Sequence, residues 1–259
     1  MNFIRIQGRR IEYDFVRAAP DAPVIVLLHE GLGSLSLWRD FPRQIMQATG
    51  CSTLTFSRYG HGRSDPLTAP RRADFMHEEA LQALPELLDR LGVKLPILLG
   101  HSDGGSIALI YAGGSRRPVS GLIVMAPHVM VEDVSVHSIQ ETKRIFGVTH
   151  LREKLARHHA DPEATFRGWN DIWLDPGFRD WNIEEFLPRI ACPILAIQGE
   201  DDEYGTMEQV DRIARLAADV DLVKLQDCGH FPHRDQPEAV IQAIVRFVGR
   251  IDSSQSRSV

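Results

Sequence analysis

Short runs of consecutive apolar residues recur along the chain and alternate with longer stretches of helical spacing. The apolar runs cover residues 24–28, 52–56, 95–99, 122–125 and 193–197, and a further strand-like run covers 221–226. Uninterrupted apolar runs of this length are typical of strands buried on both faces. Helical spacing of apolar residues is found over 76–91, 104–113 and 236–249. Strands that alternate with helices predict an α/β fold with a mostly parallel central sheet flanked by helices.

The start of the chain has a different pattern. Residues 3–6 and 10–16 alternate between apolar and polar side chains and are separated by Gly8. This pattern predicts an antiparallel hairpin at one edge of the sheet.

The alternation of strands and helices stops between residues 128 and 192, where the composition is helical and no buried-strand run occurs. We expect this segment to be a helical cap inserted after the sixth strand, so that 1–127 and 193–252 together form the core domain. Trp169 and Trp173 lie on one helical face of the cap, where they would either pack the cap core or roof a pocket. The polar residues 253–259 are expected to be a disordered tail.

Composition narrows the class of protein. The 259 residues are 43% hydrophobic and have a net charge of −6, which suits a globular enzyme and opposes binding to nucleic acid. The three cysteines form no C-x-x-C pair, the charged first residues do not match a signal peptide, and no apolar stretch approaches the length of a membrane span. We therefore expect a cytoplasmic protein without a membrane or nucleic-acid partner; the sequence leaves open whether two copies form a homodimer.

The strongest chemical signal is the run Gly100-His101-Ser102-Asp103-Gly104, which follows a predicted buried strand and opens a predicted helix. A serine flanked by glycines in this context is typical of a nucleophile elbow, because the sharp turn leaves no room for side chains beside it. The positive end of the following helix would face the reacting oxygen.

Two loops could supply the remaining groups of a catalytic triad. His230, in the run 227–233 after the last strand, is placed to act as a general base toward Ser102, and His233 on the same loop is the second candidate. The run Gln198-Gly199-Glu200-Asp201-Asp202 follows the strand at 193–197 and offers an acid to orient the histidine. The chain order is then serine, acid, histidine.

With these motifs, nearly the whole chain resembles the α/β-hydrolase-fold serine hydrolases. The resemblance selects Asp202 over its acidic neighbours, because the family acid usually lies three residues after the loop glycine. It also implies an oxyanion hole formed by the backbone N–H of Asp103 and a donor from the run His29-Glu30-Gly31-Leu32-Gly33-Ser34, where Gly31 is the expected donor. Glu30 stands where the family usually has glycine.

A second departure from the family lies at 56–64, where the family commonly has Asp at Ser57 and Arg at Tyr59, whereas this chain has its cation at Arg58. We expect Glu30 and Arg58 to form an ion pair that cancels two semi-buried charges, with direct contact to substrate as the other reading. His128, at the end of a predicted strand, would line the pocket. The candidate pocket residues are therefore Glu30, Arg58, His128, Trp169 and Trp173.

The resemblance implies a serine hydrolase that cleaves a small carboxylic ester, lactone or thioester through an acyl-enzyme intermediate, without metal or cofactor. A carbon–carbon hydrolase of aromatic ring-cleavage products is the alternative, although such enzymes commonly have Asn where this chain has His101. A non-catalytic ligand-binding scaffold is the alternative from another class. Metal-site patterns such as two histidines around a glutamate do not occur.

Overall fold

The computed structural model describes residues 1–255, and its eight strands form one sheet in the order β1-β2-β4-β3-β5-β6-β7-β8. The hairpin of β1 and β2 is antiparallel, β2 pairs antiparallel with β4, and all pairs from β4 to β8 are parallel. The predicted α/β fold with its edge hairpin is therefore confirmed. The strands are β1 (Asn2–Ile6), β2 (Arg9–Val16), β3 (Val24–Leu28), β4 (Ser52–Phe56), β5 (Ile97–His101), β6 (Gly121–Met125), β7 (Ile194–Gly199) and β8 (Val220–Leu225).

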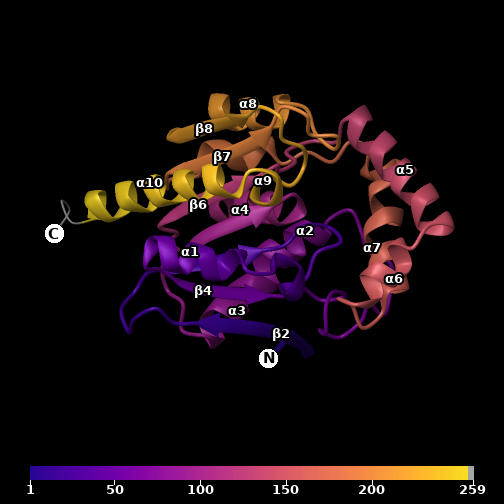
Figure 1. Cartoon of the computed structure of the whole chain (residues 1–259), viewed down its shortest axis with the longest axis horizontal. Coiled ribbons are helices and arrows are strands. Elements are labelled where there is room, and N and C mark those ends of the chain that lie inside the picture. The colour runs from indigo at the N-terminus through magenta and orange to yellow at the C-terminus, as the bar shows by residue number, and fades with distance from the viewer. Residues whose placement is uncertain (256–259) are drawn as a thin grey trace.

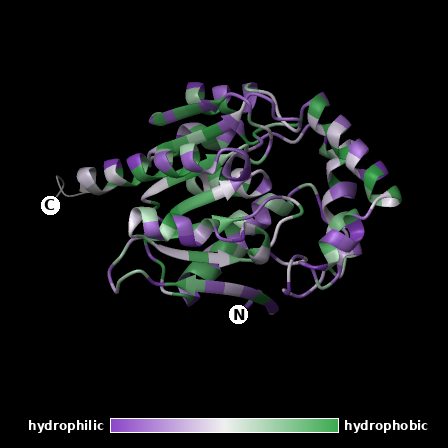
Figure 2. Cartoon of the chain, in the orientation of Figure 1, coloured by the Kyte–Doolittle hydropathy of each residue, from purple (hydrophilic) through white to green (hydrophobic). Residues whose placement is uncertain are grey.

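Helices cover both faces of the sheet, because alternate side chains of each strand point to opposite faces. Ile25 and Leu27 of β3 pack in one core with helices α1 and α10, whereas Val26 and Leu28 pack in the other with α3, α4 and α8. The strands in the middle of the molecule are largely hydrophobic (Figure 2). These helices are α1 (Phe41–Thr49), α2 (Phe75–Glu78), α3 (Leu84–Arg90), α4 (Asp103–Gly114), α8 (Glu208–Leu216), α9 (Pro232–Asp235) and α10 (Pro237–Gln255).

The predicted helix over 76–91 contains an irregular turn. A π-helical segment, η2 (Glu79–Ala83), separates α2 from α3. Such segments are rare and occur frequently near functional sites.

The segment after β6 forms the predicted helical cap. Helices α5 (Asp133–Val148), α6 (Leu151–Ala156) and α7 (Pro162–Trp173) stand together at one end of the strands (Figure 1). Two short 3₁₀ helices, η3 (Pro176–Phe178) and η4 (Glu184–Arg189), lead back to β7, and η4 packs against α4 of the core. The bounds 128–192 of the cap stay a prediction, and the last part of this range, η4, contacts the core helix α4.

The C-terminal helix runs further than the sequence pattern indicated. Helix α10 continues to Gln255, so the expectation of a disordered tail is wrong for 253–255, and 256–259 lie outside the described residues. Within residues 1–255, no helix is both long and apolar enough to cross a membrane.

Candidate active site

Ser102 lies on a strained turn between β5 and α4. Its backbone has φ +53° and ψ −121°, a conformation that L residues rarely adopt and that is typical of a nucleophile elbow. A Cβ at Gly100 would lie 2.2 Å from the carbonyl oxygen of Gly104, and one at Gly104 would lie 2.1 Å from that of Leu28. The glycines around Ser102 are therefore required by close backbone packing.

His230 and Asp202 form a buried pair. The Nδ1 atom of His230 lies 2.9 and 3.0 Å from the two carboxylate oxygens of Asp202, and the Asp202 side chain is 1% exposed. The backbone N–H groups of Tyr204 and Gly205 also donate to Asp202. Burial alone would raise the pKa of Asp202, but His230 and these donors outweigh burial and hold the pKa below its usual value. Asp201 is exposed and makes no such contact.

Ser102 and His230 line one cavity of about 60 Å³ beneath the cap, which brings together most of the predicted site residues. The predicted residues at this cavity are Ser102, His230, Gly31, Asp103, Glu30, His128, Trp169 and Trp173. Trp169 and Trp173 are also buried in the hydrophobic core, so these side chains both pack the cap and line the cavity.

The sequence interpretation missed four residues of the cavity: Leu32, Ile139, Tyr204 and Phe231. Tyr204 has its ring 4.8 Å from that of His230, and its hydroxyl lies 2.8 Å from that of Thr142 in α5. Leu32, Tyr204 and Phe231 lie within two residues of predicted site residues, so adjacency was a usable signal. Ile139 comes from α5, and only the packing of the cap places it there.

Two backbone N–H groups are available for an oxyanion. Those of Gly31 and Asp103 donate no hydrogen bond to any group within the described part of the chain, and both residues line the cavity. Position 31 must be glycine, because a Cβ there would lie 2.2 Å from two ring atoms of Trp169. Free donors beside a serine are the arrangement that an oxyanion hole requires.

The expected ion pair between Glu30 and Arg58 is wrong. The Glu30 carboxylate lies 3.6 Å from His101 Nδ1 and 3.6 Å from Arg234 Nη2. Burial would raise the pKa of Glu30, but His101 and Arg234 overcome burial and lower the pKa to about 2. Arg58 instead donates to backbone carbonyl oxygens and lines a different cavity, so it is not a wall of the pocket over Ser102.

Ser57, where the family commonly has Asp, is supplied with a carboxylate from another strand. The Ser57 hydroxyl donates to Glu12 of β2 and accepts the backbone N–H of Leu35 at 2.8 Å. Glu12 is 1% exposed. A hydroxyl and a carboxylate from β2 together hold the chain where the resemblance led us to expect one aspartate.

The pocket wall carries a carboxylate and a neutral imidazole. Asp103 accepts a hydrogen bond from Trp173 Nε1 at 3.2 Å, and burial raises its pKa although Arg58 and Arg71 act in the opposite direction. Burial lowers the pKa of His128 to about 3, and the ring packs edge-on against Trp173. His233, the second candidate base, packs against Trp38 and Phe41 outside the cavity.

The side chains of the described residues do not gather into a metal centre. Among the described residues, His, Cys, Asp and Glu nowhere form a group of three that could hold a metal ion. Structural and catalytic zinc sites need at least three protein ligands.

Comparisons with known proteins show the family and the fold of the chain. A profile described as "Alpha/beta hydrolase family" matches residues 25–243. The sequence is 24% identical to "sn-1-specific diacylglycerol lipase ABHD11" of Danio rerio, over 92% of this chain and 82% of that protein. It is 22% identical to "2-hydroxy-6-oxononadienedioate/2-hydroxy-6-oxononatrienedioate hydrolase" of Paraburkholderia xenovorans, over 95% of this chain and 94% of that protein.

Among solved structures, a thermophilic esterase from Thermogutta terrifontis superimposes with a TM-score of 0.77 at 19% identity. The match covers 97% of this chain and 99% of that one. At this level of identity the likeness concerns the fold.

Proposed function

Because the chain belongs to the alpha/beta hydrolase family and is a hydrolase, we propose that it cleaves a small carboxylic ester, lactone or thioester through an acyl-enzyme on Ser102. The observation that supports this most directly is that Ser102 and His230 line one cavity with the Gly31 and Asp103 N–H donors, while Asp202 is hydrogen-bonded to His230. These groups are the ones that acyl transfer to a serine needs.

In the proposed mechanism, His230 donates its Nδ1–H to Asp202, which leaves Nε2 free to accept the proton of Ser102. The Ser102 oxygen attacks the ester carbonyl, and the Gly31 and Asp103 N–H groups stabilise the developing oxyanion. His230 then gives the proton to the leaving alcohol or thiol, and water cleaves the acyl-enzyme by the same route. His230 must be uncharged to accept the first proton.

Cleavage of a carbon–carbon bond is the second candidate, favoured by the similarity to the Paraburkholderia hydrolase. The residue before the serine argues for the ester. His101 is fully buried, and its Nε2 donates to the backbone carbonyl of His230 at 2.7 Å, behind the site. It therefore presents no polar group to a substrate in the cavity.

The test is turnover of a panel of short-chain esters, lactones, thioesters, amides and a vinylogous diketone by the wild type, Ser102→Ala and His230→Ala. We expect ester turnover that falls about 10⁴- to 10⁶-fold in both variants with substrate binding largely kept. Melting temperatures close to wild type would show that the variants fold. Undiminished turnover by Ser102→Ala would refute the mechanism, preference for the diketone would select the second candidate, and no turnover of any substrate would favour a binding scaffold.

A further inference from the structure

One carbonyl beside the cavity accepts an unusual number of hydrogen bonds. The Glu30 carbonyl oxygen receives His29 Nδ1 at 2.7 Å, the Gly33 N–H at 3.0 Å and Arg58 Nη2 at 3.1 Å. This carbonyl and the Gly31 N–H belong to the same peptide unit. Because a peptide unit is planar, fixing its oxygen also fixes the direction of its N–H.

Arg58 is the centre of this arrangement. It follows β4, its side chain is 1% exposed, and it donates from Nη1 to the His29 carbonyl as well as from Nη2 to Glu30. Its backbone N–H donates to His29 Nε2 at 3.1 Å. His29 must therefore carry its proton on Nδ1, which donates to Glu30, so Arg58 acts on that carbonyl both directly and through His29.

The charge of Arg58 is retained although no carboxylate lies within ion-pair distance among the described residues. Burial lowers the pKa of Arg58 to about 10, against the opposing attraction of Asp103 and Glu79, so the guanidinium is protonated at neutral pH. Cations near a hydrogen-bonded chain polarise it, and polarisation of a peptide at its oxygen makes its N–H a stronger donor.

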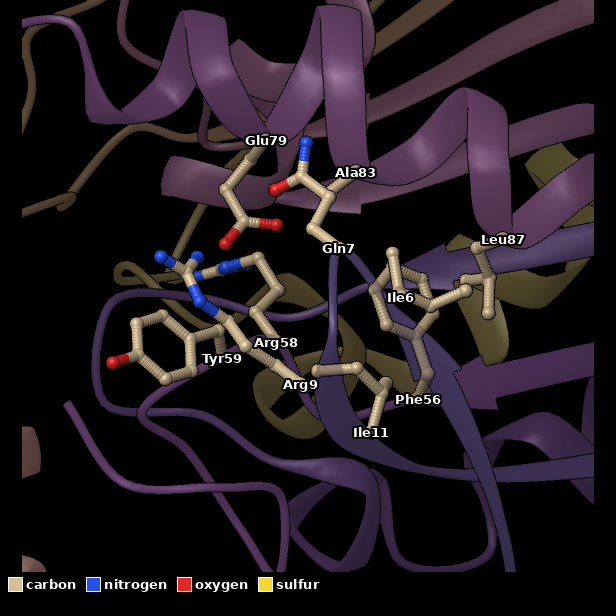
Figure 3. Close-up of a pocket in the computed structure, with 10 residues that line it drawn as sticks. All are labelled: Ile6, Gln7, Arg9, Ile11, Phe56, Arg58, Tyr59, Glu79, Ala83 and Leu87. Carbon is tan, nitrogen blue, oxygen red and sulfur yellow. The ribbon is translucent and has the colours of Figure 1, made fainter. Parts of the chain in front are cut away.

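The far side of Arg58 borders a small cavity of about 20 Å³, away from Ser102. Figure 3 shows Arg58 and Arg9 beneath η2, with the Glu79 side chain directed down toward them. The Arg58 Nε has no hydrogen-bond partner in the described structure, and Arg9 lies over the Tyr59 ring at 3.8 Å. A larger hollow of about 240 Å³ shares Arg9, Tyr59 and Glu79 with this cavity, but Arg58 does not line it.

We propose that Arg58 is a positioning residue for the oxyanion hole, which holds the Glu30–Gly31 peptide so that the Gly31 N–H points into the cavity over Ser102. The inference rests on the proposed function. Arg58 acts through the peptide and does not touch substrate. The interaction it supports strengthens only when the oxyanion forms, so its loss lowers kcat and leaves the binding of substrate nearly unchanged.

The experiment compares Arg58→Lys, Arg58→Ala and the matched control Arg9→Ala with wild type on one ester. Arg9 lines the same small cavity and lies over the Tyr59 ring, and among the described residues it forms no hydrogen bond or ion pair with the 29–33 loop. Removing one oxyanion donor typically lowers kcat about 10²- to 10³-fold. We expect a loss of about 10²-fold in kcat for both Arg58 variants with KM changed less than about threefold, and no loss for Arg9→Ala.

Chemical rescue separates positioning from a general structural role. Millimolar methylguanidinium, which matches the group removed in Arg58→Ala, should restore kcat at least tenfold and should have no effect on wild type or on Arg58→Lys. Melting temperatures are measured for all variants, and Arg58→Lys alone decides the question if Arg58→Ala does not fold.

Full kcat in Arg58→Lys, a loss confined to KM, or an equal loss in Arg9→Ala would overturn the assignment of Arg58. The Ser102→Ala variant distinguishes this failure from failure of the proposed function. If Ser102→Ala is inactive while Arg58→Lys is fully active, only the inference on Arg58 fails. If Ser102→Ala keeps its turnover, the proposed function fails with it.

Discussion

At the scale of single residues, two adjacent acids differ sharply in their surroundings. Asp202 faces His230 and accepts two backbone N–H groups, whereas Asp201 is exposed. We expect Asp202→Asn to lower kcat about 10⁴-fold, because the amide favours the wrong tautomer of the imidazole. Asp201→Asn is the matched control and should leave kcat within about twofold. Steady-state kinetics of the two variants check this, and the reverse ranking would reassign the acid.

The carboxylate of Asp103 bears on selectivity. It lines the cavity beside Ser102, and the Trp173 N–H reaches one of its oxygens. A negative wall favours substrates with a positive group. We expect an α-amino ester to be preferred over its des-amino analogue by about 10- to 100-fold in kcat/KM, and Asp103→Asn to lose that preference. Equal rates for both esters in the wild type would contradict this and indicate a neutral ester.

Local motifs made most of the site predictable from sequence, and long-range partners were the part that was not. The turn around Ser102 is built by its own glycines, and Asp202 and His230 sit at fixed positions after strands. The partners of Glu30 are His101 and Arg234, which are distant in the sequence and meet Glu30 only in the folded chain. Opposite charge at neighbouring strand ends suggested Arg58, but its Nη1 and Nη2 atoms donate to backbone carbonyl oxygens instead.

At the scale of elements, helix α7 packs with Trp169 against Gly31 of the loop after β3. A methyl group at position 31 would collide with the Trp169 ring, so Gly31→Ala must displace either the loop or the helix. We expect it to destabilise the fold by about 1–3 kcal/mol and to lower kcat/KM at least tenfold. Gly147→Ala in α5, where a Cβ meets no atom within 4 Å, is the matched control.

A double-mutant cycle tests the same contact further. Trp169→Ala should relieve part of the cost of Gly31→Ala, which gives a coupling of about 0.5–3 kcal/mol in urea unfolding. Additive effects of the two substitutions would show that Trp169 is not the obstacle.

Strands were easier to locate than the cap. Apolar runs mark buried strands directly, and each one lies close to its predicted position. The cap has no such marker, since its helices bury aromatic side chains against both the cap and the core. The 3₁₀ helix η4 packs against α4 of the core, although its composition resembles that of the rest of the segment. The extension of α10 to Gln255 was missed because its last residues are polar.

At the scale of the whole molecule, buried neutral histidines make stability depend on pH. Burial lowers the pKa of His128 to about 3, of His159 to about 4 and of His233 to about 2, and it lowers the pKa of His29 and His61 as well. Below pH 6.5, the pKa of histidine in the unfolded chain, these histidines bind protons in the unfolded chain but stay neutral in the folded chain. Each group then removes up to about 1.4 kcal/mol of stability per pH unit as the pH falls toward its folded value.

We therefore expect the free energy of unfolding, measured by urea titration, to fall steeply between about pH 6.5 and 5. His233→Phe provides the control, because His233 packs among aromatic rings and its Nδ1 has no hydrogen-bond partner in the described structure. In the variant, unfolding should take up about one proton fewer, so the free energy of unfolding should fall less steeply with decreasing pH and should be higher at pH 5. A flat profile in the wild type would contradict the assignment of these histidines as neutral.

The small volume beneath the cap bears on the rate of substrate binding. Ligand pockets generally hold about 300–1,000 Å³, whereas the space over Ser102 is about 60 Å³. Trp169 packs close to Gly31 at this space, and the Tyr204 hydroxyl contacts Thr142 of the cap. For a substrate that fits only when the cap lifts, the apparent dissociation constant is the intrinsic one divided by the open fraction. A cap that is open in about 1% of molecules weakens apparent binding about 100-fold. For such a substrate, the same opening of the cap would set the rate of substrate entry and the rate at which bulk water reaches the proposed acyl-enzyme.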